Sequence, residues 1–184
     1  MSFNNGKITA YLSKTRLIVL ATVKDGKPAL RNMAAFAADG TSPVFSTHKD
    51  TDKVRQMEAN PHVSILFVHE KQRLRSFINI TIDGIAHRVD DKDGQERIIS
   101  LIGARNELYR NRAAMGNLAE QVFYRVEPIE IKIIDFGKSP SPRGVQLIRM
   151  DNVKRWRAAK VGAQISANQV RNFDNEKRAG SVHD

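Results

Sequence analysis

The 184-residue sequence contains no cysteine and no long apolar run, and its N-terminus does not resemble a leader. Without cysteine the chain forms no disulfide and no thiolate site, so nothing in it points to an oxidising compartment. No apolar run approaches the ~20 residues that a membrane-spanning helix requires. Residues 1–6 lack the basic and apolar regions of a signal peptide. We therefore expect a protein of the cytoplasm that has no membrane partner.

Acidic residues are scarce relative to basic ones, and the formal net charge is +10. A surplus of this size attracts anions and can bind nucleic acid without sequence specificity. Residues 138–184 hold ten Lys or Arg against four Asp or Glu, so more than half of the net charge lies in the last quarter of the chain. A nucleic-acid module also needs aromatic platforms, and after Val145 only Trp156 and Phe173 are available. Nucleic acid is therefore not the expected partner.

Several motifs of catalysis and metal binding are also missing. The sequence has no glycine-rich dinucleotide fingerprint, no Walker loop and no nucleophile elbow. The five histidines show no close pair at ligand spacing, so the sequence predicts no metal site. No side chain stands out as an essential acid or base, and we assign no catalytic residue.

Short apolar runs separated by turn residues make up most of residues 1–137. The dipeptides Asp25-Gly26 and Asp39-Gly40 are hairpin turns, and Asp83-Gly84 suits a bulge or bend. The patterns predict strands at 16–23, 29–36, 43–47, 63–69, 77–89, 122–126 and 129–134, and helices at 5–14, 51–59, 95–103 and 106–115. Strands and helices do not alternate regularly, which favours a mainly β fold with flanking helices, a six- to seven-stranded antiparallel barrel.

The composition changes after residue 137. We expect one domain over 1–137, then a Pro/Ser linker over 138–165 that can add a strand at 145–150 and a helix at 152–159. Residues 166–184 are polar, basic and aperiodic, which is typical of a flexible tail.

The stretch from Leu30 to Pro61 carries most of the functional information. Two strands lead into a helix start there, and the residues around that junction are Arg31, Thr47, Thr51 and Lys53. Backbone N–H groups at a helix start are unpaired, the helix dipole favours an anion, and cationic side chains add donors. The pattern predicts a phosphate site. Two alternative interpretations stay open. Arg31 and Lys53 can be solvated surface charges, and Thr51 can be a helix N-cap.

These residues resemble the FMN-binding split-barrel family, which includes pyridoxamine 5'-phosphate oxidase and small general-stress flavoproteins. The resemblance covers about residues 17–135. It rests on Ala21-Thr22-Val23, Asp25-Gly26-Lys27-Pro28, Arg31-Asn32-Met33, Phe45-Ser46-Thr47, Lys53 and Asn60-Pro61-His62-Val63-Ser64.

The resemblance implies a split barrel that forms a homodimer with FMN at the subunit interface and acts as an oxidoreductase on a small molecule. Arg31, Thr47, Thr51 and Lys53 would hold the phosphate, and Asn79 would reach the flavin from the second subunit. The backbone of Met33, Ala34 and Ala35 would lie along the isoalloxazine ring. Asn32 and Ser46, within the matching motifs, complete the expected cofactor-binding residues.

The chain departs from the oxidase at three places. Phe36 and Asp52 stand where the oxidase has basic residues, and its substrate-binding tryptophan and arginine are not reproduced around Trp156. Pyridoxamine phosphate is therefore not the expected substrate. The same pattern also resembles deazaflavin-binding and haem-binding split barrels. A flavin carrier without turnover and a basic nucleic-acid-binding protein are the non-enzymatic alternatives.

Overall fold

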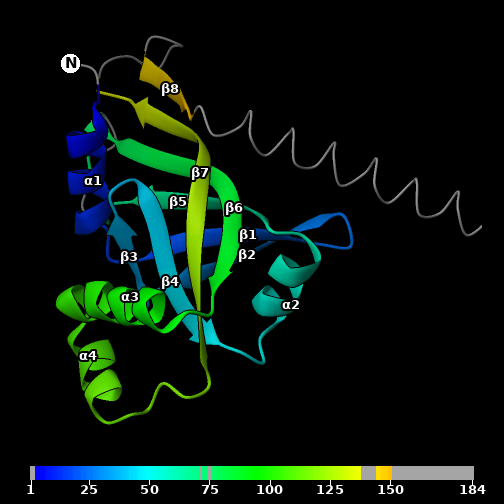
Figure 1. The fold of residues 1–184 in the computed structure, drawn as a ribbon. Coiled ribbons are helices and arrows are strands. Elements are labelled where there is room, and N and C mark those ends of the chain that lie inside the picture. The colour runs from blue at the N-terminus through cyan, green and yellow to red at the C-terminus, as the bar shows by residue number, and fades with distance from the viewer. Residues whose placement is uncertain (1–2, 71, 74–75, 138–143, 151–184) are drawn as a thin grey trace, which may run out of the picture. The chain divides into compact units, whose positions relative to one another are not determined.

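The structure is a computed structural model that describes residues 3–70, 72–73, 76–137 and 144–150 (Figure 1). Most of the predicted linker, the predicted helix at 152–159 and the predicted tail lie outside these residues. The predicted domain boundaries therefore stay predictions.

Eight strands and four helices make up the described part of the chain. Their order is α1 (Asn5–Lys14), β1 (Ile18–Lys24), β2 (Lys27–Met33), β3 (Phe36–Asp39), β4 (Ser42–His48), α2 (Asp52–Ala59), β5 (His62–Val68), β6 (Ile78–Val89), α3 (Lys92–Arg105), α4 (Glu107–Ala114), β7 (Gln121–Asp135) and β8 (Val145–Arg149). The mainly β fold with flanking helices is confirmed. The strand number exceeds six to seven because β3 is a strand of its own and β8 adds to β7, whereas the two strands predicted at 122–126 and 129–134 form the single strand β7.

All the strand pairs are antiparallel, and the hydrogen-bonded order is β2-β1-β5-β6-β7-β4-β3, with β8 paired to β7. Strands β2 and β3 stand at opposite ends of this order, yet only Ala34 and Ala35 separate them in the chain. The sheet must therefore curl until its two ends come close together. The predicted single strand at 29–36 is wrong for this reason: the chain passes from one end of the sheet to the other within it.

The β1–β2 hairpin turns at Asp25 and Gly26, as predicted. Their φ angles are 51° and 75°, so both central residues are left-handed, as the favoured two-residue hairpin turns require. This turn fixes the register in which Leu20 lies opposite Arg31. Directly opposed residues of an antiparallel pair share one face. Because Leu20 is fully buried, Arg31 starts from the core-facing side of β2.

A bulge between Asp83 and Gly84 shifts the β6–β7 register, as the sequence predicted. A Cβ on Gly84 would lie 2.4 Å from the Glu127 carbonyl oxygen, so the close approach of the two strands requires glycine. Pro128 lies opposite Gly84. Proline, which cannot donate to a ladder, is tolerated at bulges. The two strands predicted on either side of Pro128 are therefore one continuous strand, β7.

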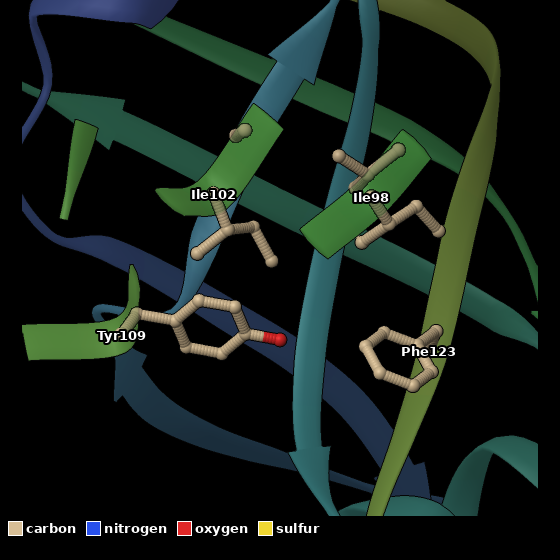
Figure 2. Close-up of a cluster of buried hydrophobic side chains, with 6 residues drawn as sticks. Ile98, Ile102, Tyr109 and Phe123 are labelled. Carbon is tan, nitrogen blue, oxygen red and sulfur yellow. The ribbon is translucent and has the colours of Figure 1, made fainter. Parts of the chain in front are cut away.

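The helices cover different parts of the sheet. Helix α2 packs against β1, whereas α1 and α3 pack against β3. Figure 2 shows Ile98 and Ile102 of α3 gathered with Tyr109 and Phe123 in one of the buried clusters, which also contains Ala37 and Val44. Across the described residues, no helix combines the length and the apolar character needed to cross a membrane.

Shortening Ile102 tests this cluster. Ile102→Ala should lower the free energy of unfolding by about 2–5 kcal/mol, because a fully buried side chain leaves a cavity. The control is Leu108→Ala on α4, where the side chain is 78% exposed and the change should stay within about 0.5 kcal/mol. Urea unfolding measures both. Equal losses would show that the α3 cluster does not stabilise the fold.

Two ion pairs of Asp39 link β3 to α3 and to β7. Asp39 accepts hydrogen bonds from Arg97 at 2.7 and 3.0 Å and from Arg125 at 2.6 Å. The hydrogen bond from Arg97 contributes most to holding the pKa of Asp39 at about 2, with Arg125 adding to it and burial opposing it. The carboxylate therefore stabilises the folded chain at neutral pH.

The pH dependence of stability follows from this lowered pKa. The contribution is fully present above the unfolded value of 3.8 and is lost as the pH falls through about 2. Asp39→Asn should cost roughly 1–2 kcal/mol at pH 7, discounted because Arg97 is exposed, and the difference should vanish near pH 2. Glu96→Gln, on the same helix as Arg97, should cost less than about 0.5 kcal/mol. Urea unfolding against pH checks both, and a pH-independent difference would contradict the assignment.

Candidate functional site

Helix α2 begins directly after β4, and its N-cap residue is Thr51. The Thr51 hydroxyl donates to the His48 carbonyl oxygen at 3.0 Å and makes no capping hydrogen bond to the helix. Asp52 is bonded to Arg55. The Val54 N–H donates to the Thr51 carbonyl oxygen at 3.0 Å. Among the described residues the N–H groups of Asp52 and Lys53 have no acceptor, so these two keep their capacity to bind an anion.

Arg31 reaches from β2 to the side of α2. Its Nη1 donates to the Thr22 hydroxyl at 2.6 Å and, more weakly, to the Leu20 carbonyl oxygen at 3.4 Å. Its Nη2 donates to the Gln56 side-chain oxygen at 2.8 Å. Arg31 is therefore held in a defined orientation and is not a freely solvated surface charge.

Lys53 lies in the first turn of α2, and its Nζ donates to the Thr47 hydroxyl at 3.0 Å. Thr47 is 7% exposed and lies near the end of β4. This contact joins two of the predicted phosphate residues directly. Thr51, the N-cap, lies two residues before Lys53.

Arg31 and Lys53 are close enough to repel one another. Burial lowers the pKa of Lys53 and the charge of Arg31 lowers it further, whereas the charge of Asp52 opposes the shift. Burial likewise lowers the pKa of Arg31, with the charge of Asp52 opposing that shift. Among the described residues, no carboxylate forms an ion pair with either cation. The structure thus gathers two partly buried positive charges beside a helix N-terminus, an arrangement that suits an anion.

The segment predicted to lie along the ring connects the two ends of the sheet. Met33 is 7% exposed, Ala34 is exposed and Ala35 is partly buried. The Ser46 N–H donates to the Ala35 carbonyl oxygen at 3.0 Å. The Ser46 side chain faces away from the Thr47–Lys53 contact, because neighbouring strand residues point to opposite faces, and its hydroxyl bonds Gln121 at 3.0 Å. The predicted cofactor role of Ser46 stays a prediction.

Two predicted residues lie apart from the cations. Asn32 is exposed on the outward face of β2, opposite Val19. Asn79 lies on β6, and its Oδ1 atom is buried without a hydrogen-bond partner in the described part of the chain. A buried unsatisfied oxygen carries a free-energy cost. The cofactor role of Asn79 stays a prediction.

A group of possible metal ligands, which the sequence did not predict, lies beyond the end of β4. Ligand atoms of His48, Asp50 and Glu120 lie within 4.8 Å of one another, and all three residues are exposed. Glu120 already binds Lys49 at 2.6 Å. Surface ion pairs explain this group, and we assign it no metal.

Sequence reasoning missed two residues of the site, Thr22 and Gln56. Both are buried polar side chains, and both bond Arg31. A signal was present: Gln56 lies three residues after Lys53, on the same side of a helix. The hairpin register also placed Thr22 on the Arg31 face of β1.

Removing the charge of Lys53 tests the repulsion between Lys53 and Arg31. Lys53→Gln should leave the stability of the ligand-free protein unchanged or raise it by up to about 1 kcal/mol, because a partly desolvated charge beside Arg31 disappears. Urea unfolding at pH 7 measures the change. Lys49→Gln, which removes the exposed pair with Glu120, is the control and should lower the stability only slightly. A larger loss in Lys53→Gln would show that this charge stabilises the fold.

Solved structures share this architecture. A conserved hypothetical protein from Mycobacterium tuberculosis, Rv2991, matches with a TM-score of 0.64 at 20% identity over 77% of this chain and 91% of that one. A heme-binding protein from Mycobacterium smegmatis matches with a TM-score of 0.64 at 12% identity, over 81% of this chain and 59% of that one. A FAD-binding protein from Mesorhizobium loti matches with a TM-score of 0.56 at 22% identity, over 71% of this chain and 94% of that one. These likenesses concern the fold, and they confirm the predicted split barrel.

Sequence comparison gives the family. A pyridoxine/pyridoxamine 5'-phosphate oxidase from Mycobacterium leprae is 34% identical over 58 residues, which are 32% of this chain and 26% of that relative. The match thus spans about a quarter of the relative. A family model described as pyridoxamine 5'-phosphate oxidase matches residues 5–135, well over half of the chain, and the chain therefore belongs to that family.

Proposed function

We propose that this chain binds FMN non-covalently at the interface of a homodimer and acts as an FMN-dependent oxidoreductase on a small molecule. One observation carries the proposal: Arg31 and Lys53 converge beside the start of α2, and neither has a carboxylate bonded to it among the described residues. The family and the FAD-binding structural neighbour add support.

The site fits a phosphate ester in both charge and donors. Arg31 has five N–H groups, of which three are needed for its hydrogen bonds to described residues. Lys53 has three N–H groups, of which one donates to Thr47. The remaining donors and the Asp52 and Lys53 N–H groups at the start of α2 would supply hydrogen bonds to an anion.

The connection between β2 and β3 supports the placement of a flat ring. Small side chains at Ala34 and Ala35 let a ring approach the backbone closely. Ala34 also lines a hollow of about 390 Å³, bounded among others by Arg16 and Arg105. We assign this hollow to substrate access. The flavin would supply the hydride chemistry, whereas the chain would supply phosphate anchoring, ring orientation and a pocket.

The outward face of the sheet supports a homodimer. Leu30 on β2 is 66% exposed and lies opposite Ala21. Val19 lies opposite Leu66 on β5 on the same outward face, and both remain partly exposed. Exposed apolar side chains on one face of a sheet suit an interface, and a second copy would cover them.

A haem-binding protein with the same fold is the second candidate, which the structural neighbour from Mycobacterium smegmatis favours. Haem propionates are anions too and would suit Arg31 and Lys53. A flavin carrier would use the same anchor without turnover. The absorption spectrum of the purified protein distinguishes flavin, deazaflavin and haem.

Charge removal at the anchor tests the proposal. We expect the protein to bind FMN, and Arg31→Ala and Lys53→Ala each to weaken that binding about 10- to 100-fold, the value of a charge-assisted hydrogen bond. Riboflavin, which lacks the phosphate, should lose little affinity in either variant. Fluorescence titration measures the dissociation constants.

The matched control is Lys92→Ala, an 86% exposed lysine that pairs with Glu96 on α3. It should leave FMN affinity unchanged. If the wild-type protein binds haem and not FMN, the flavin proposal is wrong. Unchanged FMN affinity in both anchor variants would show that the phosphate lies elsewhere.

A further inference from the structure

Two buried polar side chains meet the guanidinium of Arg31. Gln56 is 8% exposed and belongs to the buried face of α2, together with Val54 and Met57. Thr22 is 2% exposed on β1. Buried polar groups are costly unless they are hydrogen-bonded, so the contacts of these two residues need an account.

Gln56 and Thr22 bond one another and Arg31 in a closed triangle. The Thr22 hydroxyl donates to Gln56 Oε1 and accepts from Arg31 Nη1 at 2.6 Å. Gln56 Oε1 also accepts from Arg31 Nη2 at 2.8 Å. Each of the two buried oxygens thus has a partner, and the guanidinium is fixed on two sides.

Within the described part of the chain, the acceptors that hold Arg31 are uncharged: an amide oxygen, a hydroxyl and the Leu20 carbonyl. A carboxylate would bind a guanidinium more strongly than any of them. The carboxylate that acts on Arg31, Asp52, does so through space and is exposed and bonded to Arg55. The triangle therefore orients the guanidinium without neutralising it.

We propose that Gln56 and Thr22 are positioning residues that hold Arg31 as an oriented cation with no carboxylate bonded to it, so that its remaining N–H groups bind the cofactor phosphate. This inference rests on the proposed function. Gln56 lies three residues after Lys53, so one helix sets the positions of both cations. The two residues thereby determine how strongly the site prefers FMN to riboflavin.

The test uses two substitutions of nearly constant shape. Gln56→Glu places a carboxylate against the guanidinium and neutralises it. Thr22→Val removes the hydroxyl, whereas Thr22→Ser retains it and serves as the matched control. The measured quantity is the ratio of the riboflavin and FMN dissociation constants, obtained by fluorescence titration of the full chain. Thermal melting confirms that each variant is folded.

We expect Gln56→Glu to reduce this ratio at least about tenfold and Thr22→Val to reduce it about three- to tenfold. Thr22→Ser should retain the wild-type ratio. Riboflavin affinity should change less than twofold in all three variants.

The outcomes separate this inference from the proposed function. If the wild-type protein does not bind FMN, the proposed function fails and the inference with it. If FMN binds and Arg31→Ala lowers the ratio, but Gln56→Glu and Thr22→Val keep it, the positioning role is overturned. An equal loss of FMN and riboflavin affinity would overturn it too, because it would show a structural role alone. Should Gln56→Glu not fold, the Thr22 pair decides.

Discussion

The short connection through Ala34 and Ala35 constrains the whole fold. The strands on either side of it stand at opposite ends of the hydrogen-bonded order, so two residues must bring the ends of a seven-strand path together. A flat sheet cannot satisfy this requirement. Neighbouring strands lie about 4.8 Å apart, so the two ends of a flat seven-strand path would be about 29 Å apart, whereas a connection of two residues reaches only about 10 Å. Closure encloses the large apolar side chains of the core, among them Phe36, Phe45 and Phe67. It also leaves a backbone segment between the two ends that belongs fully to neither ladder.

Side chains of helix α2 form hydrogen bonds with strands near both ends of the sheet. Lys53 contacts Thr47 on β4, near one end of the hydrogen-bonded order, and Gln56 contacts Thr22 and Arg31 on β1 and β2, at the other end. One helix therefore ties together strands that are far apart along the sheet. The candidate anion site lies where these ties converge, so its geometry depends on the closure of the barrel as much as on the residues themselves.

The sequence allowed prediction of the local features and missed the features that depend on distant contacts. The turn at Asp25-Gly26, the bulge at Asp83-Gly84 and the start of α2 follow from short-range chemistry and are confirmed. The break before β3 depends on where the strands pair, which periodicity does not report. Pro128 indicated a strand end because its tolerance depends on the register shift between β6 and β7, which the sequence of β7 alone does not reveal. The role of Gln56 was missed because a buried polar side chain on a helix has no pattern of its own.

The cation pair carries a cost that folding alone does not explain. Arg31 and Lys53 repel one another and are partly desolvated, and both effects disfavour the folded, ligand-free chain. A carboxylate at the position of Gln56 would relieve much of this cost within the existing geometry. The chain has an amide there instead, and the nearby Asp52 is bonded to Arg55. Local rules of stability are broken most often at functional sites. A retained positive charge that is oriented by neutral partners suits the binding of a negative group.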